Sequence, residues 1–226
     1  MPMERKIYGI FVAGGSGFRM GSPIPKQFLE LQGRTVLQRT IEKFVSAVPD
    51  IRVITVLPAS HIETWKDICV RNSMIYPQTL VTGGITRFHS VKNALDRVPD
   101  GAVVAIHDGV RPLLSTDLIR AMAERMKSCR ALIPVVPAVD TLRSLDPSVP
   151  DPDRSRVVCV QTPQMFLSEE IKDAYGQAYD TRFTDDASVA VRKGIPLSFI
   201  DGERLNFKIT TPEDLRLAEA VLSLQE

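Results

Sequence analysis

The feature that most constrains this chain is the regular alternation of short apolar runs with stretches of helical periodicity. Strands are predicted at residues 7–13, 52–57, 78–81, 102–107, 131–136 and 197–200. Helices are predicted at residues 36–48, 62–70, 87–98, 117–127, 168–179, 186–193 and 212–224. Such alternation is typical of a mostly parallel sheet with helices on both faces. We therefore predict a Rossmann-like, three-layer α/β fold that binds its ligand where the loops after the strands gather.

One segment, residues 137–162, departs from this alternation. It contains Pro137, Pro147, Pro150 and Pro152, with two short β-like runs at 141–145 and 156–160. This composition predicts a projecting arm on a chain that otherwise forms a single domain over 1–226. Because the arm can bury little apolar surface alone, we expect it to pack on a second subunit and form a homodimer.

Charge and cysteine content limit the classes of partner. The net charge of +1 gives no general basicity, so no nucleic-acid partner is expected. No apolar run approaches the roughly 20 residues of a membrane span, so no membrane partner is expected either. The early glycines interrupt the first apolar run, which argues against a signal peptide. Three scattered cysteines without a CxxC pattern are typical of reduced thiols, and we predict a cytoplasmic protein.

A glycine-rich loop follows the first predicted strand. Its candidate ligand-binding residues are Ala13, Gly14, Gly15 and Gly17. Glycines let the backbone approach a phosphate and present its N–H groups. The phosphate-loop pattern GxxxxGK[ST] is absent, and the dinucleotide pattern GxGxxG is broken because Met20 stands at its third glycine. A nicotinamide-dependent dehydrogenase is therefore a poor match.

Two cations, Arg19 and Lys26, come shortly after this loop. Fixed cations beside a glycine loop suit a triphosphate that must release pyrophosphate, because negative charge builds on the transferred and leaving groups. Taken alone, the same residues could equally form a strand-to-helix turn with two solvated side chains.

Together, the runs Gly14-Gly15-x-Gly17-x-Arg19-Met20 and Pro25-Lys26-Gln27 resemble the signature of sugar-phosphate nucleotidyltransferases. Within that family, the chain is similar to the cytidylyltransferases that make CDP-sugar alcohols, and the resemblance runs from Ile7 to the last helix. It implies a nucleotidyltransferase fold, CTP as a substrate, and Mg²⁺ or Mn²⁺ as the metal. It also implies transfer of CMP from CTP to 2-C-methyl-D-erythritol 4-phosphate, in the non-mevalonate isoprenoid pathway.

The resemblance assigns the nucleotide side of the site. The run Gly83-Gly84-x-x-Arg87-x-x-Ser90 resembles the segment that recognises the cytosine ring, through the glycine backbone and the hydroxyl of Ser90. Asp108 closes the strongest predicted strand, and a carboxylate at that point can hold Mg²⁺ over a phosphate loop. By resemblance, Asp108 contacts both the metal and the nucleotide.

The acceptor side is assigned in the same way. The resemblance places Arg111 near the acceptor and gives Thr184 a substrate contact. It expects Thr141 and Arg154, both in the arm, to bind the acceptor phosphate in the partner's site. Lys208 would position the attacking phosphate. The predicted catalytic residues are Arg19, Lys26, Arg154 and Lys208.

Two alternatives remain beside this interpretation. One is a ribitol 5-phosphate cytidylyltransferase, which shares the glycine loop and the lysine segment. The run Asp153-Arg154-Ser155 favours the methylerythritol acceptor by resemblance. The other alternative is a catalytically inactive nucleotide-binding module, and the retention of all four predicted catalytic cations argues against it.

Overall fold

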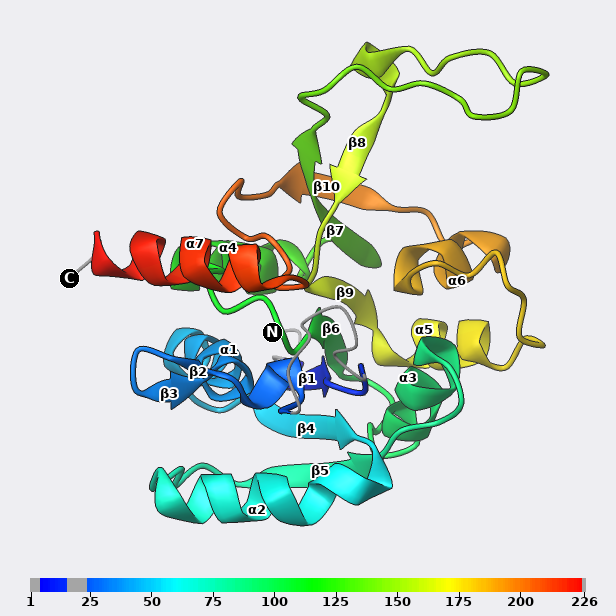
Figure 1. Ribbon diagram of the computed structural model, residues 1–226. Coiled ribbons are helices and arrows are strands. Elements are labelled where there is room, and N and C mark those ends of the chain that lie inside the picture. The colour runs from blue at the N-terminus through cyan, green and yellow to red at the C-terminus, as the bar shows by residue number, and fades with distance from the viewer. Residues whose placement is uncertain (1–4, 16–23, 225–226) are drawn as a thin grey trace.

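The predicted α/β fold is confirmed by the computed structural model, which describes residues 5–15 and 24–224 (Figure 1). The described residues form an eight-stranded sheet in the order β10-β7-β9-β6-β1-β4-β5, with β8 paired to β7. Its strands are β1 Ile7–Val12, β4 Arg52–Leu57, β5 Gln78–Thr82, β6 Val103–Asp108, β7 Ala131–Pro137, β8 Val158–Val160, β9 Gln164–Leu167 and β10 Ser198–Asp201. A small hairpin of β2 Glu30–Leu31 and β3 Arg34–Thr35 lies apart from it.

The strands that carry the predicted ligand loops are parallel neighbours. Strand β1 pairs in parallel with β4 on one side and β6 on the other, and β4 pairs in parallel with β5. The register sets Val12 beside both Val56 and Asp108. The carboxyl ends of these four strands therefore meet at one edge, where α/β sheets bind ligands.

Helices cover both faces of the sheet. They are α1 Val36–Ala47, α2 Ile62–Arg71, α3 Arg87–Leu95, α4 Thr116–Arg125, α5 Ser168–Tyr175, α6 Asp186–Arg192 and α7 Pro212–Ser223. Helices α3, α5 and α6 share one buried cluster with alternate strand residues, and α1, α2 and α4 share the other. The alternation is visible at Ile10 and Phe11, which enter opposite clusters.

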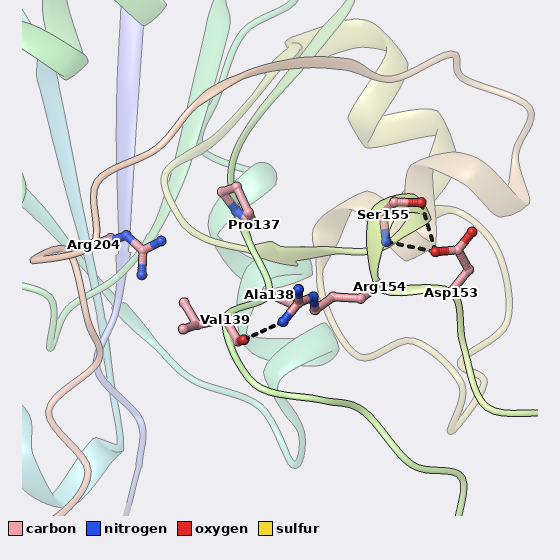
Figure 2. Close-up of a pocket in the computed structure, with 7 residues that line it drawn as sticks. All are labelled: Pro137, Ala138, Val139, Asp153, Arg154, Ser155 and Arg204. Atoms are coloured by element: carbon pink, nitrogen blue, oxygen red, sulfur yellow. Dashed lines mark hydrogen bonds between the residues drawn. The ribbon is translucent and has the colours of Figure 1, made fainter.

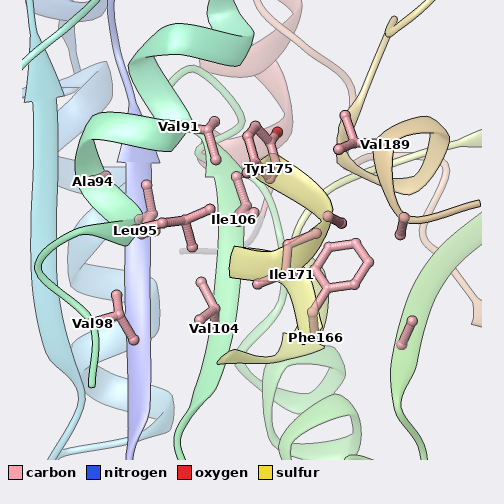
Figure 3. Packing of buried hydrophobic residues seen from close by; sticks show 14 of the residues in the cluster. Val91, Ala94, Leu95, Val98, Val104, Ile106, Phe166, Ile171, Tyr175 and Val189 are labelled. Atoms are coloured by element: carbon pink, nitrogen blue, oxygen red, sulfur yellow. The ribbon is translucent and has the colours of Figure 1, made fainter. Parts of the chain in front are cut away.

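Figure 3 shows the first of these clusters at close range. Val91 and Leu95 of α3 lie against Ile106 of β6, with Ile171 and Tyr175 of α5 beside them. Apolar side chains at helical spacing thus meet those of period two on the sheet. The packing fixes the first turn of α3, where the ligand loop ends, relative to the end of β6.

Side-chain caps fix where three of the helices begin. The side chains of Thr86, Ser115 and Thr211 each accept a hydrogen bond from a backbone N–H in the first turn of α3, α4 and α7. Such N-caps satisfy N–H groups that have no partner inside the helix. Pro212 then occupies the first turn of α7, where its missing N–H costs no hydrogen bond.

The arm leaves the body after β7 and returns through β8 (Figure 1). Only its return is a strand: β8 pairs antiparallel with β7, and the strand expected at 141–145 is wrong, because this run is irregular and pairs with no strand. Strand β9 was not predicted; it lies antiparallel between β6 and β7. The single turn η4, Arg154–Arg156, lies in the arm.

Two further observations concern the predicted environment. Cys69, Cys129 and Cys159 are free thiols. Within residues 5–15 and 24–224, no helix is long and apolar enough to span a bilayer.

Candidate active site

A cavity of about 590 Å³ opens at the carboxyl ends of β6, β1, β4 and β5. The sheet order arranges its lining. Asp108 lies at the β6 end, Gly14 and Gly15 follow β1, and Pro58 follows β4. The segment 82–87 closes the far side after β5. The cavity therefore has a charged end over β6 and β1, and a less polar end over β4 and β5.

Asp108 is the centre of the charged end. Its Oδ2 lies 3.2 Å from Arg111 Nε and 3.2 Å from Lys208 Nζ, and its Oδ1 lies 3.8 Å from Arg87 Nε. Burial alone would raise the pKa of this carboxyl, but the neighbouring Arg87, Lys208 and Arg111 hold the pKa well below its ordinary range. Asp108 is therefore a permanent carboxylate inside a cluster of cations.

Lys26 belongs to the short turn η2, Lys26–Phe28, and its side chain lines the same cavity. Its ammonium donates to the carbonyl of Ile209 at 3.2 Å, which ties it to the segment that carries Lys208. The next residue, Gln27, donates to the carbonyl of Ala13 at 2.9 Å and so ties this turn to the glycine loop. Gly17 and Arg19 lie outside the described residues.

The loop after β5 is shaped by Ser90. Its hydroxyl accepts from the Gly84 N–H at 3.0 Å and donates to the carbonyl of Thr86 at 2.9 Å. The Gly83 N–H donates to the carbonyl of Leu57 at 2.8 Å, which anchors the loop to β4. Gly83 and Ser90 thus line the cavity as expected, although the Ser90 hydroxyl already holds the loop. Its contact with a base stays a prediction.

The predicted acceptor-side residues fall into two groups. Lys208 lines the cavity, and both Lys208 and Arg111 contact Asp108 there. Arg111 Nη1 also donates to the carbonyl of Asn206 at 2.7 Å. The other group lies away from the cavity: its members are the exposed residues Thr141, Arg154 and Thr184. A single copy of the chain does not bring these three to the nucleotide side.

Arg154 lines a separate open cavity of about 610 Å³ at the root of the arm (Figure 2). Its Nη1 donates to the carbonyl of Val139 at 2.9 Å, and Arg204 lies across from it. Asp153, the acid in this cavity, accepts hydrogen bonds from the backbone and hydroxyl of Ser155 at 2.9 and 2.7 Å. Because Asp153 is hydrogen-bonded within its own turn, the guanidinium groups of Arg154 and Arg204 determine the charge of this cavity.

Two residues of the site were not assigned from the sequence. Arg87, inside a quoted motif, pairs with Asp108 and with Asp186. His107 is fully buried, and burial lowers its pKa to about 3. Its Nδ1 lies 2.9 Å from Thr162 Oγ1, which also accepts from the Asp108 N–H at 3.1 Å. The partners of Arg87 and the Thr162 partner of His107 are distant in sequence, so local patterns do not reveal these contacts. The one available signal was the position of Arg87 inside the quoted motif.

Comparison with known proteins gives one consistent result. The profile of the family described as IspD, 2-C-methyl-D-erythritol 4-phosphate cytidylyltransferase, matches residues 7–224. A relative with that description from Bacteroides thetaiotaomicron is 44% identical over 94% of this chain and 98% of its own length. Another, from Porphyromonas gingivalis strain W83, is 45% identical over 98% of this chain and all of its own length.

Solved structures agree with the sequence relatives. The chain is similar to the crystal structure of 4-diphosphocytidyl-2C-methyl-D-erythritol synthase from Anaerococcus prevotii, with a TM-score of 0.82 and 30% identity. That similarity covers 98% of both chains. It is also similar to the 2-C-methyl-D-erythritol 4-phosphate cytidylyltransferase of Thermus thermophilus, with a TM-score of 0.71 and 28% identity, over 98% of this chain and all of that one.

Proposed function

Because this chain belongs to the 2-C-methyl-D-erythritol 4-phosphate cytidylyltransferase family, we propose that it transfers CMP from CTP to 2-C-methyl-D-erythritol 4-phosphate. The products are 4-CDP-2-C-methyl-D-erythritol and pyrophosphate, and the reaction belongs to the non-mevalonate isoprenoid pathway. The observation that carries this proposal is the cavity that Gly14, Gly15, Lys26, Asp108 and Lys208 line together.

The order of strands supports one orientation of CTP. The cytosine would lie over the loops after β4 and β5, beside Gly83 and Ser90. The triphosphate would lie over β1 and β6, where Gly14 and Gly15 offer backbone N–H groups and the cations collect. The glycine loop and Lys26 would then bind the phosphates that leave.

The chemistry requires no general base. A phosphate oxygen of the acceptor forms a bond to the α-phosphorus of CTP while the α–β anhydride bond breaks, and pyrophosphate leaves with the electron pair. The attacking oxygen is already anionic near neutral pH. Lys26 and Arg19 stabilise charge on the transferred and leaving groups. Lys208 and Arg154 hold two anions together at the angle of attack.

A divalent cation fits the residues present through one carboxylate. Mg²⁺ is commonly held by one or two carboxylates together with the phosphates of the substrate. Among the described residues no group of three acidic, histidine or cysteine side chains gathers, and Asp108 is the carboxylate in the cavity. Asp108 would therefore hold Mg²⁺ or Mn²⁺ that arrives with CTP, and the ion would offset phosphate charge.

We place the active unit in a homodimer, with residues 137–162 as the dimerisation arm of one domain. Thr141 and Arg154 lie outside the cavity of their own chain. The arm also exposes large apolar side chains, which include Val139 and Val158. Exposed apolar surface of this kind is typical of an interface. A second copy of the chain would cover this apolar surface, and Thr141 and Arg154 would enter the active site of that copy.

Free thiols and a near-neutral net charge support a cytoplasmic enzyme whose partners are small molecules rather than nucleic acid or membranes. Transport of a charged nucleotide to another compartment is then unnecessary.

The test is pyrophosphate release with CTP and Mg²⁺, with 2-C-methyl-D-erythritol 4-phosphate and ribitol 5-phosphate in separate reactions. We expect release that depends on CTP and on the methylerythritol acceptor, with ATP, GTP and UTP as controls. Preferential use of ribitol 5-phosphate would replace the acceptor assignment. Absence of pyrophosphate with either acceptor, together with CTP binding, would support an inactive binding module.

A further inference from the structure

Arg87 joins three parts of the site that lie far apart in the sequence. It is the first residue of α3 and directly follows the loop that lines the cavity after β5. Its guanidinium pairs with Asp186, at the start of α6, and its Nε faces Asp108 at the end of β6. The segment before α6 carries the exposed Thr184, to which the family resemblance gives a substrate contact.

The pair with Asp186 is a fixed part of the structure. Arg87 Nη1 and Nη2 donate to the two carboxylate oxygens at 2.8 and 2.6 Å. Tyr175 donates its hydroxyl to the same carboxylate at 2.6 Å, and the Asp186 side chain is 0% exposed. A buried carboxylate that lost its bidentate partner would leave an uncompensated charge. Arg87 therefore stays on Asp186.

The contact with Asp108 is of a different kind. Arg87 Nε lies 3.8 Å from Oδ1, which is too far for a hydrogen bond. The other oxygen, Oδ2, is held at 3.2 Å by both Arg111 and Lys208. Because Asp186 restrains the guanidinium, Arg87 places a positive charge near Oδ1 without forming a hydrogen bond to it.

We propose that Arg87 is a positioning residue of this active site. It holds a positive charge near Oδ1 of Asp108, which lines the cavity, and so fixes the orientation of that carboxylate. It also ties the loop after β5 to the start of α6. The inference rests on the proposed function, since the role of Asp108 in holding the ion that arrives with CTP comes from it. Arg87 acts through Asp108 and the two segments rather than on the reacting atoms.

The competing account is that Arg87 only neutralises the buried Asp186. The double variant R87Q/D186N separates the two accounts, because it removes both charges and leaves two amides that can hydrogen-bond to each other. Under the competing account, this variant recovers both stability and activity. The single variant Arg87→Ala cannot separate them, because it leaves Asp186 buried and unpaired.

We expect R87Q/D186N to unfold within a few degrees of wild type, yet to lower kcat at least tenfold and raise the KM for the acceptor. A kcat and both KM values within about twofold of wild type would overturn the proposal. If this variant does not fold, Arg87→Lys decides, since its ammonium still neutralises Asp186 but cannot form the bidentate pair. Reduced kcat with normal stability is expected there, and full activity would overturn the proposal.

The wild-type enzyme in the same assay distinguishes a failure of the positioning role from a failure of the proposed function. If wild type releases no pyrophosphate from CTP with the methylerythritol acceptor, the proposed function has failed. If wild type is active and the Arg87 variants match it, only the positioning role has failed.

Discussion

Single side chains determine the charge of the cavity. Asp108 is one carboxylate surrounded by Arg87, Arg111 and Lys208, and Lys26 lines the same space. Asp186 neutralises Arg87, so the remaining cations outnumber Asp108. This balance attracts a polyanion, and the neighbouring cations hold the pKa of Asp108 well below its ordinary range.

Replacing Lys26 by alanine should lower kcat by about two orders of magnitude, because the variant loses a cation aimed at the leaving phosphates. Turnover is measured as pyrophosphate release at saturating CTP and acceptor. Lys66→Ala is the matched control, since Lys66 forms a surface pair with Glu63 on α2 and does not line the cavity. Normal turnover by the Lys26 variant would remove Lys26 from the catalytic residues.

His107 gives a pH prediction with a definite sign. Burial lowers its pKa to about 3 in the folded protein, against about 6.5 in the unfolded chain. Between these two pKa values, the unfolded chain binds more protons than the folded protein. The contribution of His107 to the free energy of unfolding is therefore full above pH 6.5. It is lost as the pH falls, by up to about 1.4 kcal/mol per pH unit.

The control for that prediction is His107→Asn, which offers Thr162 an acceptor near the position of Nδ1 but does not titrate. Chemical denaturation at several pH values between 7 and 5 should show a flatter dependence for the variant than for wild type. Equal slopes for the two proteins would mean that His107 does not stay neutral in the fold.

Two of the four predicted catalytic residues, Lys26 and Lys208, line the cavity, whereas sequence reasoning gave Arg87 no role, for a physical reason. Periodicity and local motifs report on neighbours within a few residues, whereas Arg87 meets Asp186 across 99 positions. Gly83 and Asp108 were found because each lies at the carboxyl end of a strand, and Lys26 was found through the Pro25-Lys26-Gln27 motif. The residues Thr141 and Arg154 were named by resemblance alone, and one copy of the chain leaves them outside the cavity.

At the level of elements, short loops at strand ends set the shape of the site. Most strands and helices were predictable because each has a clear period, and several of the helices begin at a capping residue. Strand β9 was not predictable, because its four residues, Gln164–Leu167, are too few to show a period of two. The 141–145 run has strand-like composition, but the described chain offers it no strand to pair with, so its backbone stays irregular.

The loop after β5 provides a test at this level. A Cβ on Gly84 would lie 2.4 Å from the Cβ of His89, which is closer than packed atoms allow. Gly84→Ala should therefore displace the loop, raise the KM for CTP, and cost about 1–3 kcal/mol of stability. Adding His89→Gly removes the nearest atom and should recover part of the KM. An unchanged KM for CTP in Gly84→Ala would show that this loop does not contribute to nucleotide binding.

At the level of the whole molecule, the proposed homodimer would distribute one predicted site over two chains through the arm. Its exposed apolar side chains and its two predicted phosphate contacts lie on the same projecting segment, 137–162. Because a two-fold interface repeats each contact, one arm would complete each site of the dimer.

Mixed dimers of a Lys26→Ala chain with an Arg154→Ala chain test this arrangement. One of the two sites would then combine an intact Lys26 with an intact Arg154 from the partner. We expect activity of about half the wild-type value per mixed dimer, while each variant alone is nearly inactive. Mixed dimers without activity would show that Arg154 serves its own chain.

The central claim is cytidylyl transfer to 2-C-methyl-D-erythritol 4-phosphate. Its most direct test is one reaction that contains the enzyme, CTP, Mg²⁺ and equal amounts of this acceptor and ribitol 5-phosphate, with the products identified by mass. The account predicts CDP-methylerythritol as the main product, with one pyrophosphate released for each molecule formed. Mainly CDP-ribitol, or no CDP product at all, would contradict it.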